Sequence, residues 1–117
     1  MKYLLVVSLV AGAAVVAAGT AGAATPTLNG SVGPGFTITL KQGGKSVKTL
    51  KPGSYKLVVA DKATIHNFEL EGPGVKNVET DVSKKGTTTF TVKLKKGTYT
   101  FYCKPHESSM HGTFTVK

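Results

Sequence analysis

Apolar and polar residues alternate in short runs along most of this chain, and this period of two restricts what the chain can fold into. Successive side chains of a β-strand point to opposite faces, so the alternation is typical of strands with one buried face. The runs are 36–40, 53–60, 66–70, 88–94, 97–103 and 112–117. Glycine and proline between the runs favour turns, and no helical period follows the first 24 residues. About seven short strands in one small domain predict an all-β sandwich or barrel.

The alternation also assigns inward positions to particular residues. In the run 36–40, Phe36 falls on the same face as Ile38 and Leu40. Cys103 is predicted to point inward with two aromatic neighbours of its run, and His66 with two apolar neighbours of its own. Both residues lie at strand ends, where a sandwich can bring distant segments of the chain together.

The first 24 residues have the composition of a secretory signal peptide. Lys2 precedes an uncharged, mostly apolar run, and the small residues at 21–24 offer cleavage sites. The apolar run of about 16 residues is short for a bilayer span of roughly 20, so we expect cleavage rather than an uncleaved membrane anchor. We therefore predict export to the periplasm or the extracellular space, no stable membrane span after cleavage, and a single domain over 25–117.

Lysine supplies all 15 basic residues of the chain, against 6 Asp and Glu. Because there is no arginine for bidentate contacts and the lysines are spread along the chain, we do not expect a nucleic acid as partner. A lysine-rich surface favours acidic partners, although it also serves simply to keep a domain soluble.

Cys103 is the only cysteine of the chain and so has no intrachain disulfide partner. In an exported protein an odd cysteine indicates an intermolecular, reactive or metal-bound thiol. His106, Met110 and His111 follow closely in the stretch FYCKPHESSMHG, and His66 is the one histidine outside this loop. Thiolate and imidazole together bind zinc or copper, and a thioether is a suitable weak ligand for copper. Two histidines, one cysteine and a weak axial methionine form an electron-transfer copper site.

The fourth ligand has two main candidates, the adjacent residues Met110 and His111, and Glu107 as an oxygen ligand is a distant third. Neighbours in an extended segment point in opposite directions, so only one of them reaches the metal. We predict Met110, whereas His111 would give a site of one cysteine and three histidines that holds zinc or Cu(II). Asn67, next to His66, is expected to tie the two ligand segments together through its side chain.

The patterns H-N-F (66–68), Y-C-x-P-H (102–106) and M-x-G (110–112) together resemble the cupredoxins, small blue-copper proteins of the plastocyanin, azurin and amicyanin type. The resemblance spans essentially the whole chain after the predicted signal peptide. It implies a Greek-key β-sandwich of seven to eight strands and one copper ion per chain. The ligands that it implies are His66, Cys103, His106 and, in the axial position, Met110.

In that family, electrons pass through the edge of the exposed histidine, here His106, within an apolar patch. The loops around Pro34, Pro73 and Pro105 are candidates for such a patch. We therefore expect a monomeric one-electron carrier that docks a redox partner protein, and the lysine-rich surface favours an acidic one. The alternatives are a secreted protein that buffers or delivers copper, and a structural zinc domain. An enzyme is not expected, because Cys103 is turned inward, without an obvious orienting residue for His106, and four protein ligands leave no open coordination position.

Overall fold

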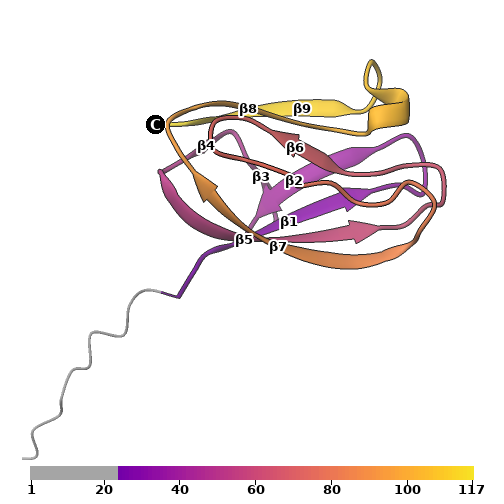
Figure 1. Ribbon diagram of the computed structural model, residues 1–117, viewed down its shortest axis with the longest axis horizontal. Helices are drawn as coiled ribbons and strands as arrows, with labels where there is room; N and C mark the ends of the chain where they lie inside the picture. The colour runs from indigo at the N-terminus through magenta and orange to yellow at the C-terminus, as the bar shows by residue number, and fades with distance from the viewer. Residues whose placement is uncertain (1–23) are drawn as a thin grey trace, which may run out of the picture.

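The computed structural model describes residues 24–117. They form two β-sheets that pack face to face (Figure 1). The prediction of an all-β Greek-key sandwich is confirmed, since the chain crosses repeatedly from one sheet to the other. The predicted signal peptide lies outside the described residues except for Ala24, so the division at residue 24 stays a prediction. Within the described part of the chain, no helix is long and apolar enough to cross a membrane.

The larger sheet has five strands in the order β3-β2-β1-β5-β7. Their bounds are β1 Thr27–Val32, β2 Ile38–Gln42, β3 Lys45–Ser46, β5 Gly53–Asp61 and β7 Gly86–Leu94. β1 and β5 run parallel and the other pairs are antiparallel. Because Val32 pairs with Asp61, β1 and β5 end at the same end of the sandwich.

The smaller sheet has four strands in the order β4-β9-β8-β6. Their bounds are β4 Thr49–Leu50, β6 Glu69–Glu71, β8 Gly97–Tyr102 and β9 His111–Val116. A short 3-10 turn, η1 (Lys104–His106), follows β8. This turn and the loop into β9 lie at the opposite end of the sandwich from the C-terminus (Figure 1).

The structure contains nine strands between residues 24 and 117, rather than seven to eight. The two-residue strands β3 and β4 are too short to show an alternation in the sequence. β1 was not recognised because Gly30 occupies one of its inward positions. A Cβ atom at Gly30 would lie 2.9 Å from the ring of Phe68, so glycine here makes room for an aromatic side chain of the core.

The predicted inward face of the run 97–103 is confirmed, because Tyr99, Phe101 and Cys103 are all buried. The run 66–70 differs from its prediction. The strand β6 covers only residues 69–71, and all five residues from His66 to Leu70 are buried. The expected outward residues Asn67 and Glu69 are buried, and their polar groups are paired by a hydrogen bond with 3.3 Å between Asn67 Nδ2 and Glu69 Oε2.

The predicted inward position of Phe36 is wrong. β2 begins only at Ile38, and 60% of the Phe36 surface is exposed. The loop before β2 is closed by a hydrogen bond of 2.9 Å from the Gly33 N–H to the Thr37 carbonyl. Phe36 therefore belongs to this loop, where the two-residue period of the strand does not apply.

Two stacked aromatic rings join the sheets next to the segments that carry His66 and Cys103. The rings of Phe68 and Phe101 lie 5.9 Å apart at an interplanar angle of 4°. Gly30 lies against Phe68, and Gly112 lies against Phe101, where a Cβ atom would overlap the ring. The two rings, stacked as a column between these two glycines, fix the spacing between the sheets next to the end of the sandwich that carries η1.

Candidate metal centre

Backbone hydrogen bonds close the segment from Cys103 to Met110 into a tight loop. The Cys103 N–H donates to the Met110 carbonyl at 3.0 Å, and the Met110 N–H donates to the His106 carbonyl at 2.9 Å. The His106 N–H donates to the Cys103 carbonyl at 3.1 Å, which forms the turn η1. Pro105 suits this turn because its fixed φ and missing N–H are tolerated in a first helical turn. Three of the predicted ligand residues are thus held together by their own backbone.

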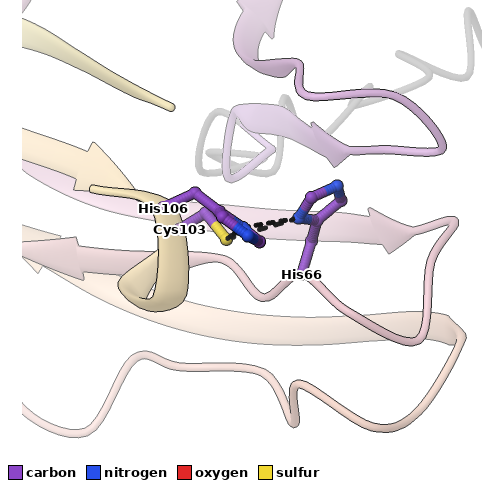
Figure 2. A group of neighbouring side chains, drawn as sticks. All are labelled: His66, Cys103 and His106. Carbon is purple, nitrogen blue, oxygen red and sulfur yellow. Dashed lines mark hydrogen bonds between the residues drawn. The ribbon is translucent and has the colours of Figure 1, made fainter. Parts of the chain in front are cut away.

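The side chains of His66, Cys103 and His106 converge at one point (Figure 2). The Nδ1 atoms of the two histidines are 3.0 Å apart. The Sγ atom of Cys103 lies 3.7 Å from Nδ1 of His66 and 3.6 Å from Nδ1 of His106. Cys103 and His66 have no exposed surface, whereas His106 is half-buried. The sandwich therefore brings residues 37 and 40 positions apart in sequence into one cluster.

The size of this cluster suits a transition-metal ion. A point equidistant from the corners of a triangle with these three sides lies roughly 2.0 Å from each corner, close to the about 2.0 Å metal–nitrogen and 2.3 Å metal–sulfur lengths of protein sites. The Nε2 atom of His66 is buried and has no hydrogen-bond partner among the described residues. The ring of His66 therefore has its polar contacts on the Nδ1 side, where the cluster lies.

Met110 and His111 occupy opposite environments, as expected for neighbours at the start of a strand. Met110 is 1% exposed and belongs to the same apolar core as Cys103. His111 is exposed, and its Nδ1 atom lies 2.9 Å from the Glu107 carbonyl. Met110 is near the cluster through its backbone bonds to Cys103 and His106. Its role as the fourth ligand stays a prediction.

The predicted bridge by the Asn67 side chain is confirmed. Its Oδ1 atom accepts the Lys104 N–H at 2.8 Å, which links the segment after His66 to the residue after Cys103. Its Nδ2 group donates to Glu69 and to the Thr80 carbonyl, each at 3.3 Å. Burial raises the pKa of the Glu69 carboxyl, and the bond from Asn67 partly opposes that rise.

Tyr102, the residue before Cys103, also contacts a carboxylate. The hydroxyl of Tyr102 donates to Oε1 of Glu71 at 2.5 Å, across the β6–β8 pair. This bond, together with burial, raises the pKa of the Tyr102 phenol. Tyr102 therefore stays protonated and holds β6 against the strand that ends at the cysteine.

Phe36 is the contact that the sequence did not reveal. Its ring meets His66 edge-on at 5.0 Å and 72°, and His106 at 4.9 Å and 78°. Phe36 and Ile65 are the large apolar side chains with most of their surface exposed among the described residues, at 60% and 52%. The only signal in the sequence was the position of Phe36 directly after the Gly33-Pro34-Gly35 turn.

One of the three loops proposed for an apolar patch is wrongly placed. Pro73 packs against Gly97, whose added Cβ would lie 2.8 Å from the proline ring. Gly97 begins β8, whereas Cys103 follows the end of that strand. Pro73 therefore lies at the end of the sandwich remote from the cluster, and the Pro34 loop contributes its apolar contact through Phe36.

Comparison with known proteins gives one family. Cupredoxin-like domains match residues 9–116 of the chain. Plastocyanin of Nostoc punctiforme is 34% identical to this chain in an alignment that covers 59% of this chain and 60% of the plastocyanin. The chain thus spans only about 60% of the length of that relative.

Solved structures of rusticyanin share the fold. Rusticyanin from Thiobacillus ferrooxidans aligns with a TM-score of 0.55 and 24% identity, covering 80% of this chain and 77% of that one. Reduced rusticyanin gives a TM-score of 0.56 and 23% identity, covering 80% and 79%. Rusticyanin is a copper protein. The His66, Cys103 and His106 cluster, with Met110 nearby, matches a type 1 copper site, in which two imidazoles and a thiolate are joined by a weak thioether.

Proposed function

The chain belongs to the cupredoxin-like family, and from this membership we propose that it is an exported blue-copper protein that carries single electrons between redox partners. His66, Cys103 and His106 would hold one copper ion, and Met110 would be its weak fourth ligand. Bound copper supplies a one-electron Cu(I)/Cu(II) couple. The observation that carries the proposal is the triangle of one sulfur and two Nδ1 atoms, which is buried on the side of His66 and Cys103.

Rigidity of the ligand segments supports electron transfer over catalysis. Cys103 is held by β8 and by the Met110 carbonyl, and the His66 segment is tied to Lys104 through Asn67. A site whose ligands are fixed by the fold rearranges little when its charge changes by one, and this keeps the barrier to electron exchange low. The four proposed protein ligands leave no position for a substrate.

Met110 is favoured as the fourth ligand by its burial and by its loop. It is buried in the same core as Cys103, and its backbone bonds keep it within the loop that carries two other ligands. His111 is exposed and engaged with the Glu107 carbonyl, so it would have to leave that contact and turn inward. A thioether also suits copper far better than zinc.

The route for electrons would lead through His106. Of the three clustered side chains only this imidazole is partly exposed, and Phe36 packs against it. A partner that excludes water from the exposed ring of Phe36 would come close to the His106 edge. The large excess of lysine over acidic residues favours an acidic partner.

Electrochemistry of the copper-loaded protein tests this function. We expect a reversible one-electron wave and no transfer of Cu(I) to a chelator during repeated cycles. A protein that delivers copper would instead lose its Cu(I) to the chelator after the first reduction. That result would replace electron transfer by copper handling while leaving the metal site intact.

A further inference from the structure

Thr80 contacts the segment behind His66 through three hydrogen bonds. Its N–H donates to the Phe68 carbonyl at 2.9 Å, and its Oγ1 atom accepts the Phe68 N–H at 2.8 Å. Its carbonyl accepts the Asn67 side-chain amide at 3.3 Å. Thr80 lies in the connection between β6 and β7, outside the two segments that carry the proposed ligands. Both residues that follow His66 are therefore held by this one threonine.

The carboxylate of Asp61 faces the hydroxyl of Thr80. Asp61 ends β5, is 5% exposed, and its Oδ2 atom lies 3.5 Å from Thr80 Oγ1. A hydroxyl has one proton to donate, so a proton directed at Asp61 leaves the oxygen free to accept from Phe68. Oδ1 of Asp61 accepts the Ala63 N–H at 3.1 Å, which shapes the turn leading to His66. Asp61 thus contacts the turn before His66 and also the threonine that holds the two residues after it.

The contact of Thr80 with Asn67 reaches the cysteine segment. Because the Asn67 amide group donates to Thr80 and Glu69, its oxygen is turned toward Lys104. The Lys104 N–H that it accepts is adjacent to Cys103, so the position of Asn67 sets how the two ligand segments face each other. A change at Thr80 would be transmitted to this contact without altering any ligand.

We propose that Thr80, supported by Asp61, is a positioning residue that fixes His66 and Asn67 relative to Cys103. The inference rests on the proposed copper site for its functional meaning. The coupling between Thr80 and the Lys104 amide does not depend on a metal, so the coupling and the copper site are tested separately. The two can therefore fail separately.

The first test uses hydrogen exchange in the metal-free full chain. Thr80→Val keeps the shape of the side chain but removes the hydroxyl, leaving the buried Phe68 N–H unpaired. We expect exchange of the Phe68 amide to accelerate by about tenfold, the effect of a lost hydrogen bond worth about 1.4 kcal/mol. Exchange of the Lys104 amide should accelerate by a smaller factor, because its acceptor Asn67 is held by the carbonyl of the same threonine. The Thr115 amide, which donates to Lys48 on the other side of the fold, should not change. Unchanged exchange at Lys104 would overturn the coupling.

The second test compares copper-loaded variants by reduction potential and visible spectrum. Thr80→Val should still bind copper but shift both, whereas Thr80→Ser, which retains the hydroxyl, should restore the wild-type values. Thr89→Val, on an exposed position of β7, is the matched control and should shift neither. A Thr80→Val protein with lower stability but wild-type potential and spectrum would reduce Thr80 to a merely structural residue.

Asp61→Asn keeps the proposal testable if Thr80→Val does not fold. An amide has one acceptor oxygen where the carboxylate has two, so it cannot accept from both the Ala63 N–H and the Thr80 hydroxyl. Because the Ala63 N–H has a fixed direction, we expect the amide nitrogen to face Thr80, a shift of potential in the same direction and faster exchange at Phe68. Wild-type values in Asp61→Asn for both quantities would contradict the support by Asp61. Absence of copper binding in the wild type would defeat the proposed function, and the exchange result would still decide the coupling.

Discussion

The ring of Phe36 lies edge-on against the imidazole of His106, with 4.9 Å between their centroids, while most of the Phe36 surface is exposed. The same ring also contacts His66. Phe36 therefore covers both proposed histidine ligands from the solvent side, in the place where a redox partner would approach.

Removal of this ring should slow electron exchange between protein molecules. Truncation of an apolar residue at the centre of a contact typically weakens association by about 1–2 kcal/mol, so we expect Phe36→Ala to lower the bimolecular rate by about tenfold. Phe36→Leu should retain most of the rate because it retains an apolar surface. Electron self-exchange measured by NMR line broadening gives these rates, and reduction potentials measured alongside exclude a change in driving force. Equal rates for Phe36→Ala and wild type would remove this face from the electron route.

If Met110 is the fourth ligand, substitutions of Met110 and of its neighbour His111 should give different results. Met110→Leu should leave copper bound, change the colour and raise the reduction potential, because a weak donor to Cu(II) is lost. His111→Ala should change little, since this imidazole is exposed and faces the Glu107 carbonyl. Visible spectra and potentials of the two variants check this. If the two results were exchanged, His111 would be the ligand.

Residues of this site could be predicted from the sequence where their contacts are local in the chain. Cys103 and His106 were predictable because they share one loop, and the alternation of their strand turned Cys103 inward. His66 followed from its being the remaining histidine. The contact of Phe36 was missed, because a loop conformation moves it away from the strand pattern that its neighbours obey.

Thr80 and Asp61 could not be recognised from the sequence for a different reason. Their contacts with the His66 segment join the end of β5, the β5–β6 connection and the β6–β7 connection, and threonine and aspartate are common in turns. β1 escaped recognition because its inward position at Gly30 is filled by the ring of Phe68, a residue distant in sequence. Such pairings depend on the packed tertiary structure.

Gly112→Ala should destabilise the metal-free protein. A Cβ atom at this position would overlap the ring of Phe101, and that ring cannot move freely because it stacks on Phe68. Overpacking of this kind reduces stability by about 1–3 kcal/mol. Gly35→Ala is the matched control, since nothing lies within 4 Å of the added atom. Urea unfolding of both variants measures the difference, and equal losses at the two sites would contradict the column of packed rings.

Asp61 gives stability a defined dependence on pH. Burial raises the pKa of its carboxyl above the usual value of 3.8, although bonds from Ala63 and Thr80 oppose the rise. The folded protein therefore takes up this proton at a higher pH than the unfolded chain, so ionised Asp61 reduces stability at neutral pH. This reduction disappears as the pH falls through the folded pKa and below the unfolded one.

The free energy of unfolding of the wild type should accordingly rise relative to Asp61→Asn as the pH is lowered from neutral toward 3. Denaturant unfolding of both metal-free proteins over this range gives the difference directly. The difference isolates Asp61, because the other carboxyls titrate in both proteins. A difference that is constant, or that falls with decreasing pH, would contradict the burial of an ionised carboxylate at this position.

The most direct measurement of the central claim is the visible spectrum of the full chain with one equivalent of Cu(II), compared with Cys103→Ser. Ligation by Cys103 predicts an intense blue or green thiolate-to-copper band that reductants bleach and oxidants restore, and that is absent from Cys103→Ser. A colourless wild-type protein that takes up zinc in preference to copper would contradict the assignment.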